Sequence, residues 1–410
     1  MNIPDCVRDH TPTSPFASFW MAGFEGADHI NLHGQPLDMA ALTGHAAQFG
    51  GDYRRAAALG LRTVRESVGW RVCAPRGHRD LNFTRLLQAA EAAQAQGTQV
   101  LWTLMHYGTP PDVRVTDADF VHRYAEFAGA AARVLRRHTG QPAIYNPINE
   151  IGFLAWALAE GGVLGNGCSE RDGYVVKRQL VQAALLGVQA IRAEDSAARF
   201  IHIEPLIHVV APADQPELQQ DAADFCAYQW QVWDMLIGRH APELGGSPAA
   251  VDWIGANHYH DAQWEIDSGA RLDWHTGDTR RRPFAELLLE AWQRYTVPVV
   301  VTETSHVGVG RALWLDDMAA QVEQAMSAGA CIQGLCLYPA VDRPDWNNHQ
   351  HWHRSGLWDA LAAGCDESAP ADPLSRRLHP GYAQALRRWQ ERWQEQSRHA
   401  ADRQGREATG

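Results

Sequence analysis

Short apolar runs alternate with amphipathic stretches along most of the 410-residue chain, and this alternation limits its possible folds more than any other feature. The runs typical of β-strands are residues 16–22, 62–66, 99–104, 143–148, 200–203, 251–256, 298–302 and 332–337. Apolar residues at helical spacing predict helices at 52–59, 83–96, 117–138, 173–194, 221–238, 284–295, 313–328 and 381–396. Eight strands in alternation with eight helices indicate a parallel sheet that closes on itself. We therefore predict an α/β fold, a single (β/α)8 TIM barrel over residues 16–396, with an N-terminal extension at 1–15 and a disordered tail at 397–410.

The amino-acid composition limits the kinds of molecule that such a barrel can bind. The formal net charge of −12 argues against nucleic acid as a partner. No run approaches the roughly 20 apolar residues of a membrane span, and the N-terminus has no apolar segment typical of a secretory signal. Seven scattered cysteines without a CxxC pair are typical of free thiols in a reducing compartment. These features predict a cytoplasmic protein that acts on a small molecule.

Cofactor signatures are missing from the sequence. It has no GxGxxG or P-loop motif. Its single lysine, Lys177, lies within a predicted helix, which argues against a Schiff-base lysine at a strand end. We therefore expect no cofactor.

Long segments follow five of the predicted strands. In (β/α)8 barrels the loops after the strands carry the functional residues. These segments are rich in Trp, His and Asp, and we expect them to roof a cleft; they are residues 22–51, 151–172, 205–220, 257–283 and 338–380.

Two of the predicted strands end at a glutamate. Glu150 follows Asn149 at the end of the fourth strand, and Glu303 follows the seventh. A carboxylate at the mouth of a buried strand is costly unless that mouth is a working site. Two such residues, brought together by a barrel, are the groups needed to cleave a glycosidic bond.

Six short segments in the right order resemble glycoside hydrolase family 1, the β-glucosidase-like retaining hydrolases. Residues 65–75 resemble the family's RFSISWSRIxP segment, with Arg65, Trp70 and Pro75 in register. Residues 103–110 resemble TLYHWDLP, and residues 252–259 resemble DFIGxNYY. Asn149-Glu150 resembles the NE of TxNEP, and residues 302–303 resemble the TE of TENG. Residues 334–346 resemble GYxxWSLxDNFEW.

Several positions depart from the family pattern. The family's first strand ends in QIEG, where this chain has Gly23, Phe24, Glu25 and Gly26. The Trp-Ser of the eighth strand is Tyr338-Pro339, and Asp345 replaces the Glu of FEW. These departures imply a sugar other than plain glucose or galactose, or a different way of holding one. Because the family's phosphate clamp after strand eight uses a lysine that is absent here, 6-phosphoglycosides are disfavoured.

The resemblance implies roles for individual residues. Glu303 would be the nucleophile, kept ionised by Arg65 and Tyr259, and Glu150 would be the acid/base. Asn149 would bond the sugar 2-hydroxyl, His106 would add a hydrogen bond, and Trp346 would stack on the ring. Glu25, Trp70 and Asp345 are the remaining predicted substrate-binding or supporting positions. The substrate would be a small β-linked glycoside, with hydrolysis and transfer to another acceptor both open.

Two other functions stay open from the residues. The first is a sugar-binding barrel without catalysis, suggested by Gly23. The second is a metal-dependent hydrolase that uses His349, His351 and His353, since three alternate histidines on an extended segment could share one face. Barrel metallohydrolases carry an HxH motif at the end of strand one, which is absent here, so we predict no metal site.

Overall fold

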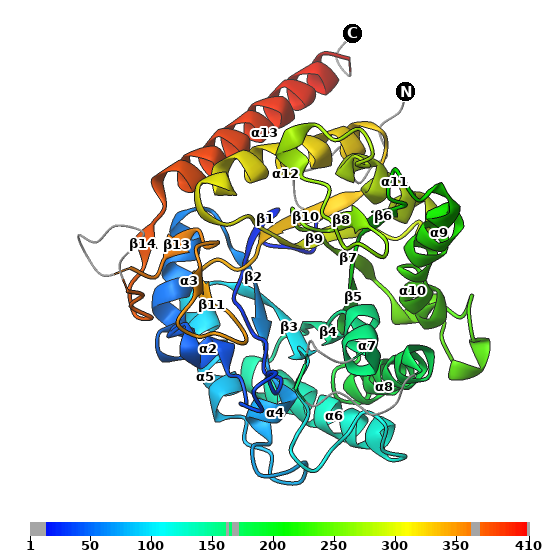
Figure 1. Ribbon diagram of the computed structural model, residues 1–410. Helices are drawn as coiled ribbons and strands as arrows, with labels where there is room; N and C mark the ends of the chain where they lie inside the picture. The colour runs from blue at the N-terminus through cyan, green and yellow to red at the C-terminus, as the bar shows by residue number, and fades with distance from the viewer. Residues whose placement is uncertain (1–13, 161–163, 166–171, 362–369, 408–410) are drawn as a thin grey trace.

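Eight parallel strands close into a barrel, which confirms the predicted (β/α)8 fold (Figure 1). The computed structural model describes residues 14–160, 164–165, 172–361 and 370–407, with side chains only up to residue 396. Around the barrel the strands lie in the order β1-β10-β9-β7-β5-β4-β3-β2. Their bounds are β1 Trp20–Gly23, β2 Thr63–Ser67, β3 Gln99–Met105, β4 Ile144–Ile148, β5 Arg199–Pro205, β7 Trp253–Asn257, β9 Val299–Thr304 and β10 Ile332–Leu337.

The helices surround the barrel. The long ones are α3 Phe49–Ala58, α5 Thr84–Gln96, α6 Phe120–Thr139, α7 Ile151–Glu160, α8 Gly173–Glu194, α9 Gln219–Tyr228, α11 Phe284–Tyr295, α12 Arg311–Ser327 and α13 Pro380–Glu407, and the short ones are α2 Met39–Leu42, α4 Trp70–Cys73 and α10 Gln231–Leu236. The predicted helix 221–238 is two helices, α9 and α10, and the Gln229 side chain between them accepts the amide of Ile207 (3.1 Å). The segment 151–172, predicted as a loop, begins with α7.

The first strand begins four residues later than predicted. Phe16 lies beneath the barrel with its ring 5.1 Å from that of Trp253, and the Ser18 hydroxyl accepts the amide of Thr63 at 3.0 Å. Residues 16–19 therefore close the amino-terminal end of the barrel instead of pairing along it. The extension predicted at 1–15 lies almost wholly outside the described residues.

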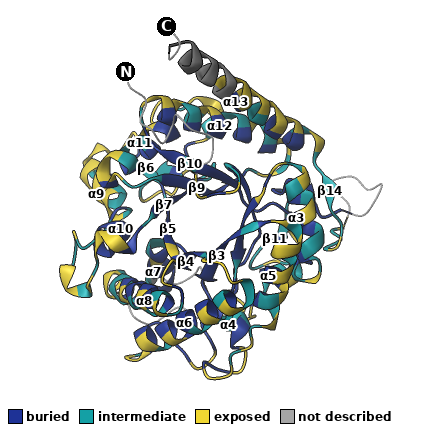
Figure 2. Ribbon diagram, turned by 180° about the vertical axis from the view of Figure 1, so that it is seen from behind, coloured by how far each residue is buried: buried dark blue, intermediate teal, exposed yellow. Residues whose placement is uncertain are grey.

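Two apolar cores follow from the two-residue period of the strands. Met21, Leu101, Ile201, Val300 and Cys336 belong to a small cluster inside the barrel. Residues of opposite parity, such as Val64 and Val301, belong to the larger cluster between strands and helices. Figure 2 shows this arrangement as buried strands inside helices whose outer faces are exposed.

Short strand pairs lie within the loops after the barrel strands. They are β6 His208–Val210 with β8 Gln263–Glu265, β11 Arg343–Pro344 with β12 Trp352–His353, and β13 Trp358–Asp359 with β14 Arg377–Leu378. These pairs give fixed structure to three of the segments predicted to roof the site.

The last helix, α13, packs along α12 and extends to Glu407, past the predicted end at residue 396 (Figure 1). The predicted disorder of residues 397–410 stays a prediction. Within the described parts of the chain, no helix has the length and apolarity needed to span a bilayer.

Candidate active site

The two predicted carboxylates lie at the carboxyl ends of β4 and β9, which have β5 and β7 between them in the barrel order. Glu150 is the second residue after β4 and is 9% exposed, and Glu303 lies near the end of β9 and is 4% exposed. The carboxyl ends of parallel barrel strands meet at one face, which is the functional face of such folds.

A bulge in β9 sets the direction of Glu303. Val299 and Val301 belong to the outer core, so simple alternation would turn residue 303 outward as well. However, the partner of Ala256 on β9 is Val301 and the partner of Asn257 is Glu303, so β9 contains one extra residue there. A bulge of this kind re-aims the following side chain. Glu303 consequently faces Arg65 across the barrel mouth.

Glu303 is held by a cation and a hydroxyl. Nη1 of Arg65 donates a short hydrogen bond to Oε1 of Glu303, and the Tyr259 hydroxyl donates to Oε2 at 2.6 Å. Burial alone would lower the pKa of Arg65, but the Glu303 carboxylate outweighs burial and raises it. Arg65 therefore stays charged, and the Glu303 carboxyl accepts one hydrogen bond from this cation and one from the Tyr259 hydroxyl.

Glu150 has a different environment. The Tyr107 hydroxyl donates a short hydrogen bond to Oε2, and Nδ2 of Asn257 donates to Oε1 at 2.8 Å. Burial, followed by the nearby charge of Glu303, raises the pKa of Glu150 to about 7. This carboxyl can therefore hold or release a proton near neutral pH.

Asn149 joins the two halves of the site. Its Oδ1 accepts from Nη2 of Arg65 at 2.6 Å, and its Nδ2 donates to the Tyr107 hydroxyl at 3.2 Å. The ring of His106 lies beside it, with Nε2 3.3 Å from Nδ2 of Asn149. Burial, with the charge of Arg65, lowers the pKa of His106 well below its usual range. The hydrogen-bond network is thus continuous from Glu303 to Glu150.

A second group of side chains lies next to this network. Oε1 of Glu25 accepts from the Tyr338 hydroxyl at 3.2 Å, and Oε2 lies 3.2 Å from Nε of Arg343. Burial raises the pKa of Glu25, and the charge of Glu303 adds to this. A Cβ at Gly23 would lie 2.3 Å from the Tyr338 ring. The Tyr338 ring therefore leaves no room for the glutamine that the family carries at this position.

Trp346 lies at the same mouth, with its ring centre 5.8 Å from that of Tyr107 and 4.8 Å from that of His29. Both nitrogens of His29 are buried without a hydrogen-bond partner among the described residues, and so is Nε1 of Trp346. Burial lowers the pKa of His29 to about 3. Neutral, unpaired donors and acceptors of this kind suit the hydroxyls of a small ligand.

Two predicted site residues lie away from the carboxylates. Trp70 is fully buried in the outer core, where its ring stacks on Phe127 at 5.5 Å. Asp345 turns toward its own loop, accepting the amides of Asn347 and Asn348 and facing Nε2 of His353 at 3.1 Å. These contacts are those of packing and of a turn, and the substrate-binding or supporting roles of both residues stay predictions.

The predicted histidine cluster is loosely arranged. The rings of His351 and His353 are 5.1 Å apart, and His353 faces Asp345. Across the described ranges, no group of three or more His, Cys, Asp or Glu side chains is arranged to hold a metal ion.

Three contributors were missed from the sequence: Tyr107, Asn257 and Tyr338. Each lies inside a family-like segment; Tyr107 is directly beside His106 and Asn257 is two positions from Tyr259, whereas Tyr338 is seven positions from Asp345. The signal was present in those segments, but only the barrel reveals which of their side chains contact the carboxylates.

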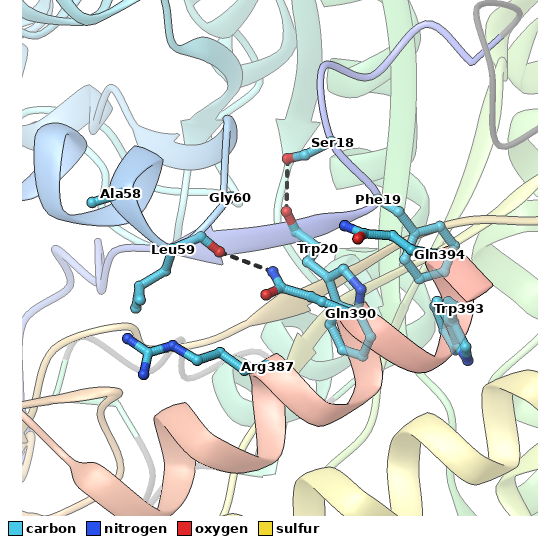
Figure 3. Close-up of a pocket in the computed structure, with 10 residues that line it drawn as sticks. All are labelled: Ser18, Phe19, Trp20, Ala58, Leu59, Gly60, Arg387, Gln390, Trp393 and Gln394. Carbon is cyan, nitrogen blue, oxygen red and sulfur yellow. Dashed lines mark hydrogen bonds between the residues drawn. The ribbon is translucent and has the colours of Figure 1, made fainter. Parts of the chain in front are cut away.

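The cavity drawn in Figure 3 is separate from this site. It has a volume of about 440 Å³ and is lined by the start of β1, the turn after α3 and one face of α13. The lining includes Trp20, the first residue of β1, whereas the carboxylates lie at the opposite ends of the strands. This cavity and the two carboxylates are therefore at opposite ends of the barrel.

Solved structures of β-glucosidases superpose on this barrel. A family 1 β-glucosidase from Thermotoga maritima is 13% identical, covering 93% of this chain and 98% of its own, with a TM-score of 0.70. The chain has the fold of the family 1 β-glucosidases. The AHE enzyme from Alicyclobacillus herbarius is 16% identical, with 92% and 98% coverage and a TM-score of 0.69. A hyperthermophilic β-glucosidase mutant is 15% identical, with 92% and 100% coverage and a TM-score of 0.68.

No protein-family profile and no curated protein matches the sequence. The resemblance inferred from six short segments is thus confirmed at the level of the fold. The catalytic roles of Glu150 and Glu303 stay predictions.

Proposed function

We propose that this chain is a retaining glycosidase that acts on a small β-linked glycoside, with Glu303 as nucleophile and Glu150 as acid/base. One observation carries the proposal: a single buried network holds one carboxylate beside a cation and another carboxyl with a pKa of about 7. The β-glucosidase fold supports it independently.

In the first step, an oxygen of Glu303 attacks the anomeric carbon while the bond to the leaving oxygen breaks. Glu150 gives its proton to that oxygen, and an ester joins the sugar to Glu303. Since the charge of Glu303 is then lost, the pKa of Glu150 falls. In the second step, Glu150 takes a proton from water, the water oxygen attacks the anomeric carbon, and the ester bond breaks. An alcohol in place of water would give transfer instead of hydrolysis.

Other residues stabilise the charge of Glu303 or hold the sugar in position. Arg65 and Tyr259 stabilise the departing Glu303 carboxylate. Asn149 is placed to bond the 2-hydroxyl, and this contact strengthens toward the transition state. A retaining pair requires carboxyl groups about 5–5.5 Å apart, and this spacing is part of the proposal.

Covalent labelling tests the proposal directly. A panel of dinitrophenyl 2-deoxy-2-fluoro-β-glycosides is incubated with the protein, and peptide mass spectrometry locates the sugar. The expected result is one label on Glu303, and its absence from the Glu303→Gln variant is the control. Hydrolysis of a chromogenic β-glycoside without any label on Glu303 would contradict the proposal.

The two open alternatives have their own outcomes. Sugar binding by calorimetry, without hydrolysis of any glycoside in a broad panel, would indicate a binding protein. Activity that is lost on chelation and restored by a metal ion would indicate a metallohydrolase.

A further inference from the structure

Another buried carboxyl lies beside the predicted acid/base. Glu204 is near the end of β5, the neighbour of β4, and is 2% exposed. Its Oε2 accepts the backbone amide of Gly152 at 2.8 Å. Its Oε1 is buried with no hydrogen-bond partner among the residues that the structure describes. The proposed mechanism gives Glu204 no part, so its burial calls for another explanation.

The backbone next to Glu204 is in an unusual conformation. Glu150 has a φ of 44°, in the left-handed region that residues other than glycine seldom adopt. β4 ends at Ile148 and α7 begins at Ile151, so no loop is available to absorb this turn. Strained backbone persists only where the surrounding structure holds it.

Two hydrogen bonds from β5 hold the turn. The amide of Glu150 donates to the carbonyl of Ile203 at 3.0 Å, and the amide of Gly152 donates to Glu204. The first amides of a helix have no acceptor within that helix. Glu204 supplies one from the neighbouring strand, on which α7 packs (Figure 1).

Building on the proposed function, we infer that Glu204 is a positioning residue for the acid/base. By holding the Gly152 amide, it fixes the turn that directs Glu150 at the glycosidic oxygen. Glu204 does not touch the substrate in this scheme; it acts only through the backbone of residues 150–152.

Glu204 performs this role as a neutral acid. Burial raises its pKa to about 8, with the charge of Glu150 adding to the rise, while the amides of Gly152 and Ile151 and the charge of Lys177 oppose it. Near neutral pH Glu204 is therefore mostly protonated, and what α7 needs from it is an acceptor oxygen. Glutamine offers the same oxygen without the acid.

The dependence of kcat/KM on the leaving group distinguishes this role from a general loss of folding. A dinitrophenolate leaves without protonation, whereas a methoxide leaves only when the acid is correctly placed. Glu204→Ala is expected to lower kcat/KM on the methyl β-glycoside roughly tenfold or more and to leave kcat/KM on the dinitrophenyl β-glycoside nearly unchanged. Glu204→Gln should restore most of the loss.

A matched control uses another helix. Asp172 accepts the amide of Tyr174 at 2.9 Å at the start of α8, the same kind of contact without a link to Glu150. Asp172→Ala should change the two substrates equally. Denaturation curves of all variants show that each is folded when assayed.

A double-mutant cycle tests the contact itself. A Cβ at Gly152 would lie 2.7 Å from Oε2 of Glu204. Gly152→Ala should therefore reproduce the leaving-group effect of Glu204→Ala, and the double variant should lose less than the product of the two single losses. Independent, multiplicative losses would overturn the inference.

Failure of the inference differs from failure of the proposed function. Glu150→Gln should lower kcat/KM on the methyl glycoside about 10²–10⁴-fold and leave kcat/KM on the dinitrophenyl glycoside nearly unchanged. If Glu150→Gln shows no such selectivity, the proposed function fails. If Glu150→Gln behaves as expected while Glu204→Ala slows both substrates equally, only the role of Glu204 is overturned.

Discussion

Two buried ionic clusters lie on opposite faces of one strand. Arg65 and Glu66 are consecutive in β2 and are both almost fully buried. Arg65 faces the barrel mouth and pairs with Glu303. Glu66 faces the helices, where its Oε1 is 2.7 Å from Nε2 of His45 and accepts the Tyr53 hydroxyl at 2.9 Å.

Charge balance distinguishes the clusters. In the outer one, the buried cations His45 and Arg376 match Asp52 and Glu66, and the half-exposed Arg55 adds a weaker contact with Asp52 at 3.3 Å. Arg376 bonds both oxygens of Asp52 at 2.8 and 3.0 Å. Burial alone would lower the pKa of His45, but the two carboxylates raise it to about 9. Burial would raise the pKa of Asp52, yet His45 and Arg376 lower it.

The inner cluster has more carboxyls than cations. Glu25, Glu150 and Glu303 share Arg65 and Arg343, and the pKa values of Glu25 and Glu150 are both raised. The comparison teaches that matched charges fix one protonation state, which suits a structural support. A surplus of buried carboxyls leaves an exchangeable proton, which suits acid–base chemistry.

The largest difference is expected from Glu303→Gln. Because the glycosyl ester can no longer form, kcat/KM should fall on the order of 10⁴-fold or more. Steady-state kinetics on a dinitrophenyl β-glycoside measures this, and a single cooperative denaturation transition checks the fold. Full activity in this variant would mean that the inner cluster is structural too.

Glu66→Gln should act on stability instead. It leaves His45 as a buried cation with one of its two carboxylates removed, at a cost of about 3–5 kcal/mol of unfolding free energy. Urea denaturation measures the cost, and the kcat of the folded variant should be essentially that of the unaltered protein. A variant as stable as the unaltered protein but inactive would reverse the roles of the two clusters.

The outer cluster also predicts how stability depends on pH. The folded pKa of His45, about 9, lies above its unfolded value. Its contribution, about 3 kcal/mol, is therefore complete below pH 6.5 and is lost as the pH rises through 9. Denaturation midpoints from pH 6 to 10 test this. The decline should disappear in His45→Gln; a decline of equal size in that variant would exclude His45 as its source.

The smallest effect concerns the fall in catalysis at alkaline pH. Glu150 must be protonated to act as an acid, so kcat/KM on a methyl β-glycoside should fall about tenfold per pH unit above pH 7. Cleavage of a dinitrophenyl β-glycoside needs no acid and should lack this fall. If kcat/KM falls at the same pH for both substrates, the fall comes from a group other than Glu150.

Much of the fold could be read from local patterns. All eight barrel strands lie where short apolar runs occur, and β10 has the predicted bounds. The predicted bounds were wrong where the chain makes tertiary contacts, as with Phe16 beneath the barrel and Gln229 between α9 and α10.

The site was less accessible to sequence reasoning. Arg65, Asn149 and Tyr259 were named because family-like segments surround them, and all three belong to the hydrogen-bond network. Their roles toward a substrate stay predictions. Trp70 belongs to an equally family-like segment but packs in the outer core. Sequence similarity marks a segment, and it does not say which face of the barrel a side chain enters.

The sequence by itself determined the barrel, because two-residue and helical periods are local and add up over the chain. Only the tertiary structure decided that Glu303 turns inward, since the bulge depends on pairing with β7. Likewise, the contact between Arg65 and Glu303 joins residues 238 positions apart. The carboxyl pKa values also depend on burial and on neighbours that meet only when the barrel closes.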